Sequence, residues 1–390
     1  MLYKLTADSW DDRERQAITD VVASGQLTMG PKTAQFESAF AKYLGRKFAL
    51  MMNSGSSANL IGVASLFYRS KNPLCRGDEV IVPAVSWSTT YSPLQQYGLK
   101  LRFVDVELDT LNMDVEQMRL ALTPRTKMIV GVSILGNPAA LDVMRKFADE
   151  HGLIFFEDNC ESLGAELNGK KTGTFGDIST FSTFYSHHIS TVEGGILATD
   201  DHELYSLAKS LRAHGWTRDV PRIEGLYEPE EEDIEGEYKF ILPGYNVRPQ
   251  EINAAVGLVQ LEKLPEMLRI RRENLALFKK LFEGDPRFIL QRENGLSSSF
   301  SFTIVLSPLW NRSRMWVTDA LSEAGIETRM ITGGCFPRHD AIKYYYSEVV
   351  GKLPNANLIH DMGFFVGNHP FPLAAQIHEL RKVLDRWCRI

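Results

Sequence analysis

The sequence has little cysteine. Its four cysteines, Cys75, Cys160, Cys335 and Cys388, lie far apart along 390 residues, and no two of them form a CxxC pair. Zinc sites and iron–sulfur clusters need several closely grouped ligands. The spacing therefore argues against a metal centre of either kind and against a disulfide framework, and we expect four free thiols.

The chain also has no long apolar run and no excess of basic residues. No run approaches the roughly 18 apolar residues of a membrane span, and the N-terminal stretch MLYKLTADSWDD contains no apolar core of signal-peptide length. Lysine and arginine total 43 against 49 acids, which gives a net charge of -6 at pH 7. Nucleic-acid binders need a basic surface that this balance does not supply. We therefore expect a cytoplasmic protein with no nucleic-acid or membrane partner.

Short runs rich in β-branched residues alternate with helical patterns through the first half of the chain. Four of these runs are each followed by a helical stretch: KFALMM, DEVIVPA, LRFVDV and KMIVGVSIL. A fifth run, LIFFEDN, follows the last of the four helical stretches. Such alternation is typical of βαβ units around a largely parallel sheet. We predict an α/β fold with a large domain at 1–250 and a smaller α+β domain at 251–390, with the N-terminal segment expected against the small domain.

Local signals set three further expectations. The SWDD segment at 9–12 has the form of a capping box and predicts the start of a first helix, which should end at Gly25. Helical periodicity over 248–284 is expected to break at Pro265. Residues 222–237 are acidic and poor in large apolar residues, as expected of an exposed loop.

Three segments place chemistry-bearing residues at the ends of predicted strands. NSGSSANL puts Gly55 and Ser56 between a strand and a helix, where backbone N–H groups form a phosphate cradle, although an ordinary capped turn is the alternative. FFEDNCES puts Asp158 at a strand end, where an acid binds a cation, a ribose or the ring nitrogen of a pyridine cofactor, or caps a helix. AVSWSTT offers Trp87 as a stacking face or as a core residue.

Two adjacent histidines, His187 and His188, precede a Gly-Gly pair in SHHISTVEGG. The runs ISTFSTFY and GILATD predict strands on either side of them. Neighbouring residues of an extended chain face opposite ways, so only one of the two rings can face a ligand. Imidazole exchanges protons near neutral pH, which makes either ring a candidate acid–base group.

Together these motifs are similar to those of the sugar-modifying branch of the pyridoxal phosphate (PLP) enzymes with the aspartate aminotransferase fold. The resemblance spans nearly the whole chain and includes RAHGW at 212–216 and GYNVRPQEINAAVG at 244–257. Aminotransferases of this family carry a lysine, in the pattern Lys-x-Ile-x-x-x-Glu-Gly-Gly, that bonds covalently to the cofactor. Here His187 stands at the lysine's place, and no lysine occurs between Lys171 and Lys209.

A histidine at this place is found in the nucleotide-sugar 3-dehydratases of the family, and the resemblance implies their chemistry. It implies a mostly parallel mixed sheet, a homodimer with shared active sites, and PLP or pyridoxamine phosphate (PMP) held without a covalent bond. The expected reaction removes the C3 hydroxyl of a nucleotide-linked 4-keto-6-deoxyhexose, with GDP as the expected nucleotide and glutamate as the amino donor. The scattered cysteines favour the type that serves colitose and O-antigen synthesis without an iron–sulfur cluster or a reductase partner.

The resemblance also assigns roles to single residues. His187 is the expected catalytic base, which moves a proton at the C4′ carbon of the cofactor, and His188 is the alternative base if the register shifts by one; otherwise it has a structural or substrate-side role. The expected cofactor contacts are Gly55, Ser56 and Ser182 at the phosphate, Trp87 at the ring face, Asp158 at the ring nitrogen, Glu161 near the ring hydroxyl, and Asn246 reaching the phosphate from the neighbouring subunit. We expect no metal.

The sequence leaves other assignments open. His214 has a family-like position, with a cap or packing role as the alternative. Arg218, Arg248 and Arg329 are candidates for a nucleotide pyrophosphate or for salt bridges. A nucleotide-sugar aminotransferase that works without the lysine is the second candidate function. A non-catalytic regulatory or cofactor-binding protein is the third, and the retained cradle, acid and histidine argue against it.

Overall fold

The computed structural model describes residues 2–218, 220, 223, 226–227, 239–309 and 313–387. Most of the acidic segment predicted as a loop at 222–237, and Cys388, lie outside the described residues. Cys75, Cys160 and Cys335 are free thiols, as expected. Within the described ranges, no helix is both long enough and apolar enough to cross a membrane.

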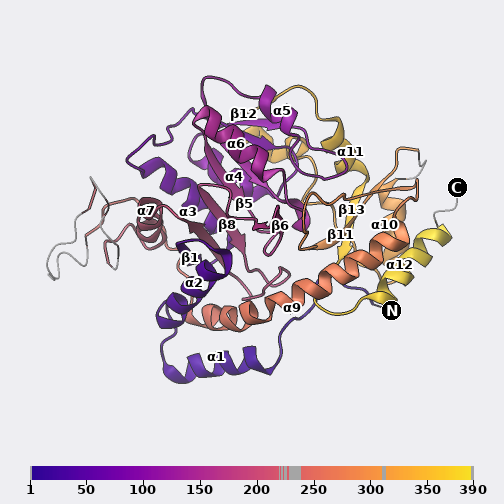
Figure 1. The fold of residues 1–390 in the computed structure, drawn as a ribbon, viewed down its shortest axis with the longest axis horizontal. Coiled ribbons are helices and arrows are strands. Elements are labelled where there is room, and N and C mark those ends of the chain that lie inside the picture. Colours follow the sequence, from indigo (N-terminus) through magenta and orange to yellow (C-terminus); the bar gives the residue numbers. More distant parts are fainter. Residues whose placement is uncertain are drawn as a thin grey trace.

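Among the described residues, eight strands form one mixed sheet at the centre of the fold (Figure 1). In spatial order they are β1 (Phe48–Met52), β9 (Gly195–Thr199), β8 (Ile178–Ser182), β5 (Ile154–Asp158), β4 (Thr126–Val132), β2 (Glu79–Pro83), β3 (Lys100–Val104) and β12 (Ser347–Val349). β9 runs antiparallel to both of its neighbours, and the other neighbouring pairs are parallel. The predicted α/β fold with a mostly parallel mixed sheet is confirmed.

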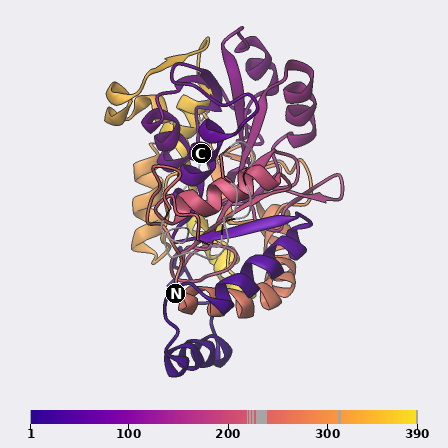
Figure 2. The same ribbon diagram turned by 90° about the vertical axis from the view of Figure 1, so that its left-hand side faces the viewer.

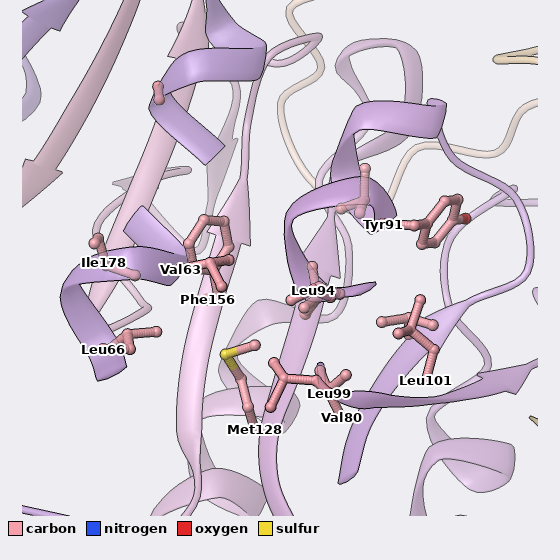
Figure 3. Close-up of a cluster of buried hydrophobic side chains, with 14 of the residues drawn as sticks. Val63, Leu66, Val80, Tyr91, Leu94, Leu99, Leu101, Met128, Phe156 and Ile178 are labelled. Carbon is pink, nitrogen blue, oxygen red and sulfur yellow. The ribbon is translucent and has the colours of Figure 1, made fainter. Parts of the chain in front are cut away.

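Helices cover both faces of this sheet, which explains why its strands are apolar on both sides. They are α2 (Pro31–Leu44), α3 (Gly55–Tyr68), α4 (Ser88–Gln96), α5 (Val115–Leu120), α6 (Leu141–His151) and α7 (His202–Arg212). Successive strand residues enter opposite cores: Phe155 packs with residues of α5 and α6, and Phe156 with residues of α3 and α4. Figure 3 shows Phe156 and Ile178 against Val63 and Leu66 of α3.

A second, separate core lies in the C-terminal part of the chain. The antiparallel strands β10 (Phe288–Leu290), β11 (Ser301–Leu306) and β13 (Gly363–Gly367) pack with α10 (Arg314–Glu323) and α12 (Ala374–Trp387). Tyr3 belongs to this core and pairs with Ile326, so the N-terminal segment does lie against it. The remaining short elements are β6 (Glu166–Leu167), β7 (Lys170–Lys171), α11 (Pro354–Met362) and the 3-10 turns η1 (Ile134–Gly136), η2 (Phe336–Arg338) and η3 (Asp340–Tyr344).

The long helix α9 (Glu251–Phe282) connects the two cores (Figure 1). Ala254 and Leu264 near its beginning pack with α2, whereas Phe278 and Phe282 at its end belong to the C-terminal core. The domain boundary at 250/251 stays a prediction, because this one helix contributes to both cores. Figure 2 shows α1 (Asp12–Ser24) beneath the body of the molecule, beside α9.

The predicted break at Pro265 is wrong, because α9 is continuous through it. Pro265 is exposed, while Leu264 and Leu268 beside it are buried. The carbonyl that loses its partner to proline is that of Leu261, one turn earlier, which is only partly buried. The packing of the buried face of α9 outweighs the local cost of the proline.

The position of the first capping box is also corrected. The cap of α1 is Asp11, whose Oδ1 accepts a hydrogen bond from the Arg13 N–H at 2.8 Å, and Glu14 accepts one from the Asp11 N–H at 2.8 Å. A carboxylate at the cap gains more than a hydroxyl from the positive end of the helix dipole. Ser9 instead donates to Gln260 of α9 at 3.0 Å. The helix ends at Gly25, as predicted.

Candidate active site

The predicted cradle lies at the carboxyl ends of β1 and β8. Ser54 caps α3 by accepting from the Ser57 N–H at 3.1 Å, and Gly55 is the first residue of the helix. A Cβ on Gly55 would lie 2.7 Å from the Cβ of Ser182 at the end of β8, so the two walls approach this closely only with glycine. The first turn of α3 and the hydroxyls of Ser56 and Ser182 share this edge, where the helix dipole favours an anion.

The glycine pair after the histidines has a packing reason at the same edge. Gly195 begins β9 and pairs with Met52 of β1 and Ser182 of β8. A side chain at this position would overlap the backbone of Ser54 and Gly55. Gly195 therefore lets the start of β9 lie directly against the cradle, and Gly194 before it leaves room for the Thr183 and Thr191 hydroxyls.

Asp158, at the end of β5, is a buried carboxylate that only hydrogen-bond donors satisfy. Its Oδ2 accepts from Asn59 Nδ2 at 2.9 Å and from Thr90 Oγ1 at 2.8 Å, and its Oδ1 accepts from the Cys160 N–H at 3.1 Å. In the described part of the chain it has no ion-pair partner. A buried anion held in this way is ready for a cationic ligand atom, because its charge is desolvated but not neutralised.

Sequence reasoning missed the two side chains that hold Asp158. Asn59 is 2 % exposed and lies in the first turns of α3, whose other buried residues are apolar except for Ser65. Thr90 lies in the first turn of α4. The signal that would have found Asn59 is an amide on the buried face of an apolar helix, which needs a partner inside the fold.

Glu161 lies three residues beyond Asp158, in the turn after β5. Its Oε2 accepts from the Leu135 N–H at 3.0 Å, and Leu135 has a left-handed backbone with φ of 51°. Burial, with a smaller contribution from the Asp158 carboxylate, raises the pKa of Glu161 to about 7, although the Leu135 N–H opposes the shift. Near neutral pH this carboxyl group therefore both donates and accepts hydrogen bonds.

His187 lies in the turn between β8 and β9, with one ring nitrogen engaged. Its Nδ1 is 2.6 Å from the carbonyl oxygen of Cys160. A carbonyl only accepts, so Nδ1 carries the proton and Nε2 keeps its lone pair. Nε2 has no hydrogen-bond partner among the described residues. Burial is the main cause that lowers the pKa of His187 to about 4, which keeps Nε2 unprotonated at neutral pH.

His188 faces away from this position. Its ring is 1 % exposed, and Nε2 lies 3.3 Å from the carbonyl oxygen of Ser298 in the C-terminal part of the chain. The backbone here is a turn, closed by a 2.9 Å bond from the His187 N–H to the Phe184 carbonyl, so the extended chain assumed from the sequence is wrong. The two rings nevertheless have different hydrogen-bond partners, the carbonyl of Cys160 for His187 and that of Ser298 for His188.

Contacts connect most of the expected site residues at one edge of the sheet. Gly55 lies against Ser182, and a Cβ on it would come within 3.0 Å of the Cys160 sulfur. The Cys160 backbone in turn bonds both Asp158 and His187. The Ser56 hydroxyl donates to Thr89 at 2.9 Å, which joins the cradle to the segment that carries Trp87. The Trp87 side chain is 54 % exposed and is therefore not the core residue of the alternative reading.

Among the described residues the Asn246 side chain has no hydrogen bond to this group, although the neighbouring Val247 carbonyl accepts from the Asn53 N–H at 3.0 Å. Asn246 is exposed, its Oδ1 accepts from Arg248 Nε at 3.1 Å, and its backbone bridges Ala213. Arg248 also lies over the Trp216 ring at 6.0 Å.

The other open assignments resolve in part. The backbone of His214 has φ of 64° and its N–H donates to the Tyr245 carbonyl at 2.6 Å, while its ring packs 4.9 Å from the Trp216 ring. These contacts give His214 a role in the turn and in packing. Arg218 and Arg329 are exposed.

The fold and the arrangement at the sheet edge define an enzyme of the aspartate aminotransferase-like class. The chain belongs to the DegT/DnrJ/EryC1/StrS aminotransferase family, whose model matches residues 8–376. It is 45 % identical over 386 residues to GDP-4-keto-6-deoxy-D-mannose 3-dehydratase of Yersinia pseudotuberculosis, covering 98 % of each chain.

Two solved structures are similar over the same extent. The Escherichia coli GDP-4-keto-6-deoxy-D-mannose-3-dehydratase with bound hydrated PLP has a TM-score of 0.96 and 46 % identity, with 98 % of this chain and 99 % of that chain covered. A GDP-4-keto-6-deoxymannose-3-dehydratase with a trapped PLP-glutamate geminal diamine has a TM-score of 0.96 and 45 % identity, with 98 % and 100 % covered. Both structures therefore share the fold along essentially its whole length.

Proposed function

We propose that this protein is a PLP-dependent 3-dehydratase that acts on GDP-4-keto-6-deoxymannose. The products are the GDP-linked 4-keto-3,6-dideoxy sugar, ammonia and 2-oxoglutarate, the last formed when glutamate restores PMP. The observation that carries the proposal is His187, which stands where the family's aminotransferases have a lysine and presents an unprotonated Nε2. The names and bound ligands of the relatives support the substrate, the cofactor and the amino donor.

The residues at the sheet edge fit the cofactor. A phosphate group requires N–H and hydroxyl donors around a tight backbone, which the first turn of α3, Ser56 and Ser182 supply. A pyridine nitrogen that stays protonated requires a buried anion, which Asp158 supplies. An aromatic ring requires a flat apolar surface, which the exposed Trp87 offers. These contacts are our assignments for Gly55, Ser56, Ser182, Trp87 and Asp158.

When bound, PMP supplies an amine for the C4 ketone of the sugar and a protonated ring that withdraws electrons. Asp158 stabilises the positive charge on the ring nitrogen. His187 accepts the C4′ proton at Nε2, and once protonated it donates that proton to the departing C3 hydroxyl. A protonated Glu161 donates a hydrogen bond toward the ring hydroxyl region, which its pKa of about 7 permits at neutral pH. The Cys160 carbonyl holds His187 in the tautomer that this requires.

Several finer assignments rest on the same proposal. We infer a homodimer in which Asn246 reaches the cofactor phosphate of the neighbouring subunit; its exposure within one chain supports this. We also propose that the enzyme needs no reductase, since its four cysteines are widely spaced along the sequence, and that its product serves colitose and O-antigen synthesis. A cytoplasmic location stays a prediction.

The test is a single-tube reaction. Purified protein is incubated with PLP, glutamate and GDP-4-keto-6-deoxymannose, the sugar is followed by mass spectrometry, and ammonia and 2-oxoglutarate are counted. We expect a sugar nucleotide short of one oxygen, with one ammonia and one 2-oxoglutarate for each product. His187→Asn is the matched control, because it removes the base while keeping a polar side chain; it should bind PLP and form no product.

The other outcomes separate the alternatives. Nitrogen retained in the sugar would show an aminotransferase that works without the lysine. Equal turnover by the wild type and His187→Asn would show that this imidazole is not the base. An unchanged sugar, in a protein that binds PLP and converts glutamate, would overturn the assigned substrate while leaving the amino-donor half of the reaction in place.

A further inference from the structure

The loop 297–300 comes from the small C-terminal core, yet it lies against the histidine pair. The Phe300 ring is 5.1 Å from the His187 ring at an interplanar angle of 73°, and 5.7 Å from the His188 ring. Phe300 is only partly buried, while Ser297, Ser298 and Ser299 are buried. An aromatic side chain more than a hundred residues away in sequence therefore forms part of the surroundings of the proposed base.

The backbone of this loop is fixed to the segment that follows β4. The Phe300 N–H donates to the Leu135 carbonyl at 3.1 Å, and the Ser298 N–H donates to the Gly136 carbonyl at 2.9 Å. Gly136 permits this approach, because a Cβ there would lie 2.7 Å from the Ser299 nitrogen. Leu135 is also the residue whose N–H bonds Glu161, so the loop and the proposed cofactor site share one support.

Arg271 of α9 holds the loop from the other side. Its Nη1 donates to the Phe300 carbonyl at 3.4 Å and to the Asn368 carbonyl, and Asn368 donates from Nδ2 to the Ser299 carbonyl at 3.1 Å. Arg271 is 4 % exposed and has no acidic partner among the described residues. A guanidinium buried without an anion is costly, so the Phe300 and Asn368 carbonyls are the groups that offset the burial of Arg271.

His188 provides a third anchor. The Ser298 carbonyl can only accept, so His188 donates from Nε2 and its Nδ1 is a lone pair that has no partner within the described residues. Its ring is buried between the turn after β8 and the loop 297–300, and it does not reach the position occupied by His187. The second histidine therefore binds the loop rather than a ligand.

We infer that Phe300 is a positioning residue for the His187 imidazole, and that His188 and Arg271 serve to hold Phe300 in place. The inference rests on the proposed function only for the chemistry of His187. The imidazole has one hydrogen bond, from Nδ1 to Cys160, and its ring makes edge-to-face contacts with Phe184 at 6.0 Å and with Phe300 at 5.1 Å. Phe184 is exposed, whereas Phe300 is held by the loop described above, so the Phe300 contact is the one that limits tilting of the ring about the Nδ1 bond and sets the direction of Nε2.

The charged groups around His187 define what a change at Phe300 should do to its titration. Arg271 disfavours the protonated ring and Asp158 favours it, while burial is the dominant effect and lowers the pKa to about 4. Phe300→Ala would admit water to the ring and leave both charges in place. The pKa of His187 should then rise toward its ordinary value of about 6.5.

The chain offers a matched control two residues away. Phe302 is fully buried in the small core, stacked on Phe278 at 4.7 Å, and has no ring contact with either histidine. Phe300→Leu and Phe302→Leu make the same chemical change on the same stretch of chain. We expect Phe302→Leu to lower the melting temperature with little change in kcat. Phe300→Leu should lower kcat roughly 10- to 100-fold with KM within a factor of two, because misplacing a reacting group carries such costs. Phe300→Tyr, which keeps the ring, should restore most of the rate.

A second readout does not depend on turnover. The full-length holoenzyme is treated with diethyl pyrocarbonate over a range of pH, and mass spectrometry with fragmentation follows modification of His187, with His187→Asn to assign the signal. In the wild type the rate should be flat down to about pH 5, since the ring stays unprotonated. In Phe300→Ala it should fall as the pH drops below about 6.5.

These outcomes separate the inference from the proposed function. If no dehydration is found in the wild type but the modification profile still shifts in Phe300→Ala, the positioning role stands and the assigned reaction fails. If dehydration is found while Phe300→Leu and Phe302→Leu behave alike, and the modification profile is the same in Phe300→Ala and the wild type, Phe300 does not position His187.

Discussion

Replacing Gly55 by alanine should separate the cofactor cradle from its opposite wall. The added Cβ would lie 2.7 Å from the Ser182 Cβ and 3.2 Å from its Cα. Carbon atoms pack at about 3.5 to 4.0 Å, so the two walls must move apart by roughly 1 Å. Overpacking of this size costs about 1 to 3 kcal/mol of folding free energy. A phosphate hydrogen bond lengthened by as much is largely lost, and because a charged hydrogen bond contributes about 1.5 to 3 kcal/mol, PLP should bind about 10- to 100-fold more weakly.

Gly257→Ala is the matched control for this change. The Gly257 Cβ would lie 2.8 Å from a ring carbon of Phe36, an overlap of nearly the same size in the core beside α9, away from the cradle. Urea unfolding should show both variants destabilised to a similar degree, while a PLP titration followed by absorbance should show weaker binding in Gly55→Ala alone. Equal PLP affinity in the two variants would refute the assignment of Gly55 to the cradle.

Three further predictions follow from the structure. His369 is 5 % exposed, donates from Nε2 to the Lys4 carbonyl at 2.9 Å, and has a pKa that burial lowers to about 4. As the pH falls through 6.5, the unfolded state takes up the His369 proton before the folded state does, so stability is lost between about pH 6.5 and 4. The loss of unfolding free energy from pH 7 to 5, measured in urea, should therefore be about 2 kcal/mol smaller in His369→Gln than in the wild type. Equal losses in the two proteins would contradict this. Asp158→Asn should keep a free energy of unfolding, measured in urea, within about 1 kcal/mol of the wild type, but lower kcat on the order of 100-fold, since it removes the anion proposed to face the ring nitrogen. A wild-type rate would remove Asp158 from the mechanism. Mixed dimers of Asn246→Ala and His187→Asn should regain activity that neither parent has, because one site then holds both native residues, and absence of complementation would place Asn246 in its own subunit's site.

The sequence predicted the large sheet well because each strand is buried on both faces. MIVGV has no polar residue, and the two acids of IFFED come only at its end, so the assignment of these runs did not depend on tertiary detail. β12 is different. It is a three-residue strand that includes Glu348, and it pairs with β3 only because the C-terminal part of the chain returns to the sheet edge. Pro265 is the same kind of case, since the packing of α9 decides the outcome and the local propensity does not.

For the proposed site, the sequence predicted residues whose position in the chain already suggests their chemistry. Asp158 ends a strand, Gly55 opens a helix, and His187 replaces a lysine in a fixed pattern. It did not identify partners that act through the backbone or from a distant segment. The Cys160 carbonyl has no side-chain signal at all, and Phe300 reads as one more apolar residue in an alternating strand.

The turn after β5 explains why a histidine can work where the relatives' aminotransferases use a lysine. A lysine needs no acceptor to define its reactive atom, since its single nitrogen is that atom. An imidazole has two nitrogens, and a base at Nε2 requires a hydrogen-bond acceptor for the proton on Nδ1. The Cys160 carbonyl supplies it at 2.6 Å, in the same turn whose N–H bonds Asp158. Any change that moves this turn should therefore alter the ring-nitrogen contact and the base together, so the exchange of lysine for histidine is tied to backbone geometry that a side-chain pattern does not reveal.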